Sequence, residues 1–410
     1  MTEIHTTCCV AGGGPAGMML GFLLARAGVD VVVLEKHADF LRDFRGDTVH
    51  PSTLEVMHEL GLLEEFLKLP HRQVRRLGGI VGDTPVRIAD FSHLPTRCKF
   101  IALMPQWDFL NFLAERGRRY PLFHLHMRAE VTGLIEEGGR IVGVRATTPD
   151  GELVVRSALV VGADGRTSVV RERAGLTVED IGAPMDVLWM RLSRRESDGA
   201  EALGRIAAGR MFVMIDRGDY WQCAYVIRKG AADEIKAQGL DAFRNAIVEV
   251  APLMRDRVEE LKTWDDVKLL TVKIDRLPQW HRPGLLCIGD AAHAMSPVGG
   301  VGINLAVQDA VAAANRLAAP LRAGTLSEDD LTAVQQRRMF PTRMTQRLQV
   351  FIQNNVLSRV LASRGTIAPP WPVRLVSSCP MLQRIPARLV GLGVRPEHVQ
   401  TPEAVPASQA

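Results

Sequence analysis

The 410-residue sequence lacks the long apolar runs and the cysteine spacings that define several protein classes. It has no run of about 18 uninterrupted apolar residues, which argues against a membrane-spanning helix. Its six cysteines form no Cys-x-x-Cys pair and no cysteine–histidine spacing suited to zinc. We therefore predict reduced thiols, with neither a disulfide framework nor a metal site. The first residues lack the basic start and longer apolar stretch of an export signal, so we expect a soluble, cytoplasmic protein.

Acidic residues are missing from one long segment. Residues 331–396 contain ten arginines and no acid, and with Glu397 and Glu403 the stretch 331–410 has a net charge of +8. Because the whole chain carries +4, the first 330 residues carry −4. A segment of one sign suits anionic lipid, an acidic partner or nucleic acid. No aromatic platform or known module accompanies it, so we expect no nucleic-acid binding.

A βαβ unit is predicted at the start of the chain. Residues 8–11 form a short apolar strand, residues 12–17 a glycine-rich turn, and residues 18–27 a helix that ends at Gly28. The β-branched run 29–34 is typical of a buried parallel strand and ends at Glu35. This order favours a parallel sheet that binds a dinucleotide.

The turn has the spacing Gly-x-Gly-x-x-Gly. Gly12 permits the tight turn, Gly14 lets the backbone approach a pyrophosphate, and Gly17 allows the helix to pack closely on the strand. Glu35 can accept hydrogen bonds from an adenosine ribose, so the pattern predicts FAD or NAD and disfavours NADP. The residues assigned to the cofactor here are Gly12, Gly14, Pro15, Ala16, Gly17, Glu35 and Lys36.

Two later glycine clusters favour FAD over NAD. Residues 159–168 are a buried strand that runs into a turn at Asp164-Gly165, and residues 284–293 repeat this order at Gly289-Asp290. The loop 297–304 then opens a long helix through Asn315. An acid such as Asp290 can bind ribityl hydroxyls, and N–H groups at a helix start can face the flavin edge that gains negative charge on reduction. NAD has no ribityl chain, so these clusters indicate FAD.

With these motifs in this order, residues 5–330 resemble the group A flavoprotein monooxygenases, the para-hydroxybenzoate hydroxylase-like family that includes ubiquinone-biosynthesis hydroxylases. The resemblance implies an α/β fold with a Rossmann-like FAD-binding domain that is discontinuous in sequence, an antiparallel-sheet substrate domain and a C-terminal helical segment. It also implies noncovalent FAD. The expected limits are 1–75, 100–180 and 268–330 for the FAD-binding domain, 76–99 and 181–267 for the substrate domain, 331–395 for the basic helical segment and 396–410 for a disordered tail.

The resemblance also assigns single residues to FAD. Arg45 lies where the family places an arginine near the flavin, Gln106 where it has a polar residue close to the phosphates, and Val131 where its backbone meets the adenine. Asp164 is assigned to binding FAD and NAD(P)H, or alternatively to bracing its own turn. The assigned residues of the last two motifs are Gly289, Asp290, Pro297, Gly299, Gly300, Val301, Gly302 and Asn304.

The middle of the chain is predicted to form the sheet that encloses the substrate. The segments 185–192, 210–215 and 220–227 are typical of antiparallel strands, with a hairpin turn at 218–219. Strands send only every second side chain to one face, so only part of this set can line a pocket. The substrate candidates are Trp189, Phe212, Met214, Tyr220, Trp221 and Tyr225.

The reaction implied by the resemblance is hydroxylation of an aromatic or quinone-like compound. NAD(P)H, bound transiently, would reduce FAD, and O2 would form a C4a-hydroperoxide that passes one oxygen atom to the substrate. A base would help to form a phenolate, and the candidates by residue type and position are His50, His293, Tyr220 and Tyr225, although His293 is assigned rather to packing near the cofactor loop. The residues assigned to catalysis are His50, Tyr220 and Pro297. Dehydrogenation or epoxidation on the same fold, or a flavin redox sensor without turnover, are alternatives.

The basic segment is predicted to be helical and amphipathic over 326–364, with an apolar pattern again at 382–392. One interpretation packs it beside the FAD domain with its arginines in water or paired to the acidic body. The other places it on an anionic membrane, at the inner face, or in a homodimer contact. The Pro-, Ala- and Ser-rich residues after Arg395 are expected to be disordered.

Overall fold

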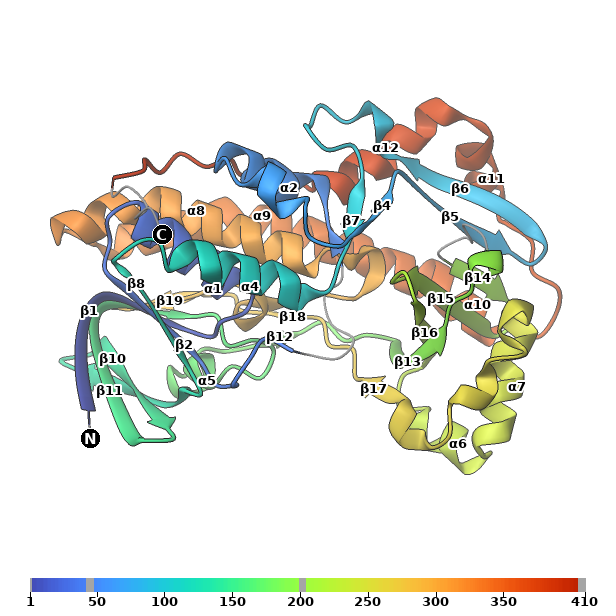
Figure 1. Ribbon diagram of the computed structural model, residues 1–410, viewed down its shortest axis with the longest axis horizontal. Helices are drawn as coiled ribbons and strands as arrows, with labels where there is room; N and C mark the ends of the chain where they lie inside the picture. Colours follow the sequence, from blue (N-terminus) through green and yellow to red (C-terminus); the bar gives the residue numbers. More distant parts are fainter. Residues whose placement is uncertain (1, 42–47, 199–203, 405–410) are drawn as a thin grey trace.

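The largest sheet carries the glycine-rich turns at the ends of its strands. A computed structural model describes residues 2–41, 48–198 and 204–404 (Figure 1). The strands of this sheet are β1 (Thr2–Ala11), β2 (Val31–Glu35), β8 (Phe123–Met127), β9 (Glu130–Glu137), β10 (Arg140–Thr148), β11 (Gly151–Gly162), β19 (His281–Arg282) and β20 (Leu285–Cys287). Their order is β19-β20-β11-β1-β2-β8, and β10 and β9 extend from β11. The pairs among β20, β11, β1, β2 and β8 are parallel, which confirms the predicted α/β fold.

Helices pack over this sheet, as Figure 1 shows. They include α1 (Pro15–Arg26), α2 (Pro51–Glu59), α3 (Leu63–Phe66), α4 (Gln106–Gly117) and α8 (Gly302–Ala323), while the short α5 (Val169–Arg173) contacts β9. α1 is buried along nearly its whole length because it lies against both α4 and α8. α8 continues beyond its predicted end at Asn315 and stops at Gly324, which takes the left-handed conformation that favours glycine.

A second sheet has seven strands and is mainly antiparallel. The strands are β5 (Arg76–Val81), β6 (Thr84–Asp90), β13 (Met185–Ser193), β14 (Gly204–Ala207), β15 (Arg210–Asp216), β16 (Tyr220–Arg228) and β17 (Lys268–Leu270), in the order β17-β13-β16-β15-β14-β5-β6. The helices α6 (Ala232–Ala237) and α7 (Leu240–Val250) lie beside it. The predicted domain limits stay predictions, although the strands come from two separate stretches of chain, 76–90 and 185–270.

Two three-stranded sheets complete the strand pairing. One contains β3 (Thr48–Val49), β7 (Ile101–Leu103) and β4 (Arg72–Val74), and the other contains β12 (Glu179–Asp180), β18 (Asp275–Arg276) and β21 (His293–Ala294). In the second of these sheets, β21 follows the turn at Gly289 directly and pairs with β18. This pairing fixes the segment between the turn and the loop 297–304.

The C-terminal part is helical, as predicted, but its long helix buries several polar side chains and exposes several apolar ones. It comprises α9 (Glu328–Ile352), a π-helical turn (Gln353–Leu357), α10 (Ser358–Ala362), α11 (Trp371–Ser378) and α12 (Pro380–Gly391). Arg338 is buried and pairs with Asp309 of α8, as the interpretation that pairs the arginines with the acidic body allows, whereas Phe340 and Phe351 of α9 are exposed. The buried residues of this segment include several polar ones, and three glutamines among them bond to the chain between β18 and the loop 297–304. These polar residues are Arg338, Thr342, Gln346, Gln349 and Gln353. Within the described parts of the chain, no helix is long and apolar enough to cross a membrane.

The expected disorder after Arg395 is wrong for residues 396–404. Glu397 is buried and pairs with arginines of α9, and the N–H of Val399 donates to Glu59 in α2. The Ala404 N–H donates to the carbonyl of Arg26 at the end of α1. A polar, proline-containing tail is therefore ordered by hydrogen bonds to α1, α2, α8 and α9, which its composition does not indicate.

Candidate functional site

The first glycine turn joins β1 to α1 and requires glycine at two places. Gly12 has a φ of 106°, and a Cβ there would lie 2.3 Å from the carbonyl oxygen of Ala163. A Cβ on Gly17 would lie 1.9 Å from the carbonyl oxygen of Gly12, so only glycine lets α1 approach the strand this closely. A Cβ on Gly14 would meet nothing within 4 Å. The turn is therefore tight on its inner side and open in front of the helix.

The start of α1 has the features of an anion site. Pro15 occupies the first turn, no side chain caps the helix, and Ala16 and Gly17 follow with N–H groups at the positive end of the helix dipole. Glu35 at the end of β2 accepts hydrogen bonds from the backbone N–H groups of Gly13 and His37, each at 3.0 Å. These bonds fix the carboxylate beside the turn, while the neighbouring Lys36 is exposed.

The Asp164 turn follows β11 and supports the alternative that this acid braces its own turn. Its carboxylate accepts hydrogen bonds from the Ser168 hydroxyl and from the Val170 N–H. Burial raises the pKa of Asp164, although these hydrogen bonds oppose the effect. Two residues further on, the Arg166 guanidinium pairs with Asp290 at 3.0 Å. The two predicted acidic turns are thus joined by an ion pair.

The Gly289 turn is bound by a buried carboxylate on α8. Asp309 accepts hydrogen bonds from the N–H of Gly289 at 3.1 Å, from Nε2 of His293 at 2.6 Å and from Nε of Arg338 at 2.9 Å. Burial alone would raise the pKa of Asp309, but the charges and hydrogen bonds of His293 and then of Arg338 lower it below its usual value. Arg338 also pairs with Glu397, so the turn, α8, α9 and the tail share one network.

The loop 297–304 is fixed to two other elements. On one side the Thr48 hydroxyl donates to the carbonyl of Gly300 at 2.8 Å, and a Cβ on Gly300 would lie 2.5 Å from that hydroxyl. The side chain of Asn304 accepts from the His50 N–H and the Thr53 hydroxyl. On the other side Gln349 of α9 donates to the carbonyl of Val298. The loop leads through Pro297, Gly299, Val301 and Gly302 into α8.

Two further residues assigned to FAD lie on other elements, and a third is not described. Gln106 is the half-buried first residue of α4, and Val131 is buried in β9, opposite Ala146 of β10. Arg45 lies outside the described residues. These assignments stay predictions.

The substrate candidates divide between the two faces of the second sheet. Phe212, Met214, Trp221 and Tyr225 form one buried cluster with Phe243 of α7, so they build the core of this layer. The helix α7 covers the face of the sheet on which these four side chains lie, and their assignment to the substrate stays a prediction. Strand alternation turns Trp189 and Tyr220 to the opposite face.

That opposite face meets the cofactor loop. Met185 and Val226 pack in one cluster with Val298 of the loop 297–304. Trp189 is half-buried beside Val213 in the adjacent cluster. This arrangement places the apolar face of β13, β15 and β16 against the loop that precedes α8.

The catalytic candidates are not gathered at one place. Tyr220 is six residues from Val226 along β16, about 20 Å at 3.3 Å per residue, and the Arg191 guanidinium stacks 3.9 Å from its ring centre. Pro297 starts the cofactor loop, near the Val226 end. His50 is buried, its Nδ1 lies 2.7 Å from the Val390 carbonyl, and burial lowers its pKa to about 4. A histidine of this kind is a hydrogen-bond acceptor at Nε2 but a weak base near neutral pH.

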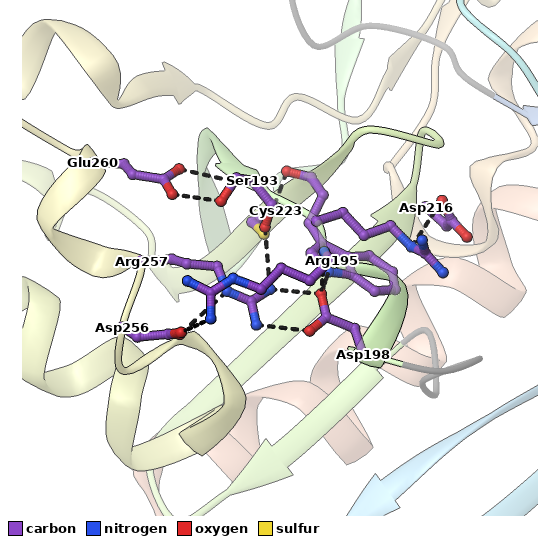
Figure 2. A network of polar contacts seen from close by, with 10 residues as sticks. Ser193, Arg195, Asp198, Asp216, Cys223, Asp256, Arg257 and Glu260 are labelled. Carbon is purple, nitrogen blue, oxygen red and sulfur yellow. Dashed lines mark hydrogen bonds and ion pairs between the residues drawn. The ribbon is translucent and has the colours of Figure 1, made fainter.

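A network of ion pairs lies beside the second sheet near the start of β16, as Figure 2 shows. The Arg257 guanidinium forks onto both carboxylate oxygens of Asp198, at 2.6 and 2.7 Å, and the Trp221 indole donates to the same group. The hydrogen bonds of Arg257 lower the pKa of Asp198 far below its usual range. Both side chains are almost fully buried, so the network stabilises the sheet.

Sequence reasoning missed the polar residues that hold the cofactor loops. Arg166, Asp309, Gln346 and Gln349 all bond to backbone or side chains of these loops from other elements. The available signal was the spacing of the uncharged polar residues at 342, 346, 349 and 353. This spacing places them on one face of a helix, where they can bond to other parts of the protein instead of to water.

The site has room and hydrogen-bond partners suited to FAD. Cβ atoms built on Gly14 and Gly302 meet nothing within 4 Å, so space lies in front of both helix starts. Among residues 2–41, 48–198 and 204–404, the buried atoms Nδ2 of Asn304 and Nε2 of His50 have no hydrogen-bond partner. Buried polar atoms without partners are rare unless a ligand or water meets them. The residues present therefore fit the cofactor.

Comparisons with known proteins agree with this assignment. The fold and the three cofactor loops define an FAD-dependent monooxygenase of the para-hydroxybenzoate hydroxylase-like type, an oxidoreductase. Residues 5–348 match the family model described as FAD binding domain, and the chain belongs to this family.

Relatives and solved structures extend this finding. The chain is 33% identical to 6-methylpretetramide 4-monooxygenase from Streptomyces rimosus, over 94% of this chain and 92% of that protein. It is 30% identical to dialkyldecalin synthase from Streptomyces rugosporus, over 77% of this chain and 66% of that one. A solved anhydrotetracycline hydroxylase from Streptomyces rimosus is similar in fold, with a TM-score of 0.73 and 25% identity over 96% of this chain and 77% of its own.

Proposed function

We propose that this monooxygenase uses NAD(P)H and O2 to hydroxylate a polycyclic aromatic compound of the polyketide type. The balanced reaction consumes a hydride from NAD(P)H, a proton and O2; one oxygen atom enters the substrate and the other leaves as water. The observation that carries the proposal is the apolar face of β13 and β16, where Met185 and Val226 pack against Val298 of the loop of the FAD site and the adjacent cluster contains Trp189. The substrate class is proposed from the names of the relatives reported above.

Different residues of the chain would bind different parts of the cofactor. The open start of α1 would take the pyrophosphate, and Glu35 the ribose. Asp290, oriented by Arg166, would accept hydrogen bonds from ribityl hydroxyls, and the start of α8 together with Asn304 would face the polar edge of the ring. FAD, when bound, supplies the electron transfer and the reaction with O2.

The remaining residues position substrate and exclude water. The half-buried ring of Trp189 and the side chains of Val187 and Val213 form an apolar surface from neighbouring strands. A flat aromatic ligand buries large apolar area against such a surface. Because the face is part of a seven-stranded sheet, it can hold a ligand in one orientation without first ordering a loop.

The proposal is tested by following NADH and NADPH oxidation, O2 uptake and product mass with FAD-loaded protein. The panel contains polycyclic phenols of the anhydrotetracycline type and single-ring phenols. We expect a polycyclic compound to accelerate oxidation and to gain one atom of 18O from 18O2. Oxidation that no compound stimulates, or a product without added oxygen, would contradict the proposal and favour the sensor or dehydrogenase alternatives.

A matched pair of variants tests the placement of the substrate. Trp189→Ala should raise the KM for the aromatic substrate about ten-fold, because it removes a ring from the proposed surface. Trp264→Ala removes a half-buried tryptophan on the α7 side, where it packs against Phe243, and should leave KM unchanged. FAD content is measured for both variants. Equal KM values for the two variants would refute this placement.

A further inference from the structure

The helix α12 is packed on one side only. Its buried stripe consists of Gln383, Ala387 and Gly391, which are spaced by four residues. These residues lie against β6 and the turn after it, and a Cβ on Gly391 would already come within 2.7 Å of Leu94. Because the inner face is filled by small residues in tight contact, the orientation of α12 on the sheet is fixed.

The outer face of the same helix is apolar as well. Met381, Ile385 and Leu389 follow one another at four-residue spacing on the side away from the buried stripe, and they are exposed by 69, 60 and 39%. In α11, Trp371 and Leu375 form the same kind of stripe, exposed by 75 and 51%. Both helices pack against β6 and against each other, at the edge that Figure 1 shows above β5 and β6.

Arginines accompany these stripes without acidic neighbours in the segment. Arg374 in α11 and Arg384 and Arg388 in α12 are exposed. Residues 331–396 contain no acid, and the acids that follow, Glu397 and Glu403, pair with Arg337 and Arg338 of α9 and with Arg26 of α1. The surface formed by Trp371, Arg374, Leu375, Met381, Arg384, Ile385, Arg388 and Leu389 is called the α11–α12 face below.

We propose that the α11–α12 face binds an anionic lipid membrane surface. Two short consecutive helices with apolar residues on the outer side and arginines at its border have the composition of interfacial helices that lie in the plane of a membrane. A tryptophan at the outermost position suits the headgroup level, where its ring is apolar and its N–H reaches water. The arginines would attract anionic headgroups.

The charges favour a membrane over a second copy of this chain. In a symmetric dimer the same patch meets itself, so the arginines of both copies would approach each other without any acid of the segment between them. The apolar stripe of α9 is a weaker candidate, because the Arg395 guanidinium covers the ring of Phe340 at 4.4 Å. The α11–α12 face also offers more exposed large apolar side chains than α9.

The test is sedimentation of the FAD-loaded full chain with vesicles. Phosphatidylcholine vesicles are compared with the same vesicles that contain one third phosphatidylglycerol, at low and at high salt. We expect sedimentation only with phosphatidylglycerol, and less at high salt because the attraction is screened. Arg384→Gln should weaken the partition about five-fold, whereas Arg322→Gln, an exposed arginine at the end of α8, should have no effect.

A second pair of variants tests the apolar stripe. Ile385→Ser should weaken partition about ten-fold, and Leu269→Ser, which changes an exposed leucine of β17, should not. Melting temperature, FAD content and oxidation of NAD(P)H control for folding. No binding to either vesicle, equal binding to both, or equal effects of the two serine variants would overturn the proposal. So would a concentration-dependent dimer that Ile385→Ser dissociates, which would assign the face to a second copy.

Discussion

Removal of the Arg338 guanidinium should destabilise the protein far more than removal of its neighbour. Arg338→Met keeps an unbranched apolar stem but leaves two buried carboxylates, Asp309 and Glu397, without one partner each. Loss of one member of a buried ion pair costs about 3–5 kcal/mol. We expect about 3 kcal/mol, at the lower end of this range, because Asp309 keeps His293 and Glu397 keeps Arg337.

Arg337→Met is the matched control for this change. Arg337 pairs with the same Glu397, but its side chain is half exposed, and such pairs contribute about 0–1 kcal/mol. The free energy of unfolding is measured for both variants by urea titration of the first transition, with FAD release followed separately. If the two variants lose the same stability, the argument from burial is refuted.

The pH dependence gives an independent check of the same reasoning. In the wild type the pKa of Asp309 is lowered, so its stabilising contribution is present above the unfolded value of about 4 and is lost as pH falls through the folded pKa. Without Arg338 this pKa should rise, but His293 still lowers it below the unfolded value. The deficit of Arg338→Met should therefore stay constant between pH 8 and pH 5 and shrink as the pH falls below about 4, where Asp309 is protonated in the variant before the wild type. A deficit that does not shrink in acid would contradict this account.

Three further predictions concern other residues. Gly17→Ala should destabilise the apoprotein, because its Cβ would lie 1.9 Å from the carbonyl oxygen of Gly12. Gly14→Ala should fold normally but bind FAD at least ten-fold more weakly, because its methyl group enters the open space in front of α1. Thermal melting measures the stability of the two variants, and equilibrium dialysis measures their affinity for FAD. His50 has a pKa of about 4, so His50→Gln should leave the shape of the activity profile between pH 6 and 9 unchanged, and the loss of an ionisation there would contradict its neutral state. The lowered pKa of Asp198 means that its contribution is present above pH 4 and lost in acid, so Asp198→Asn should lower the urea midpoint at pH 7 and lower it less at pH 3.

The sequence by itself predicted the fold class and the cofactor correctly. It could do so because the determinants are local: Gly12 needs its positive φ, Gly17 its missing side chain, and each turn lies between a strand and a helix that are adjacent in the chain. The order of three such turns along the chain then favoured FAD. The assignments of single residues to FAD, including Asn304 and Val131, stay predictions.

The tertiary structure alone decided which side chains face which layer. Alternation along β15 and β16 leaves both faces equally apolar in sequence, and only the position of α7 assigns Phe212 and Trp221 to the core. Likewise the sequence leaves open whether Arg338 lies in water or pairs with the acidic body, and only the fold brings Asp309, 29 residues away, to it as a buried partner. Patterns within one element are set by short-range geometry, but the partners of a buried charge come from elements that only folding brings together.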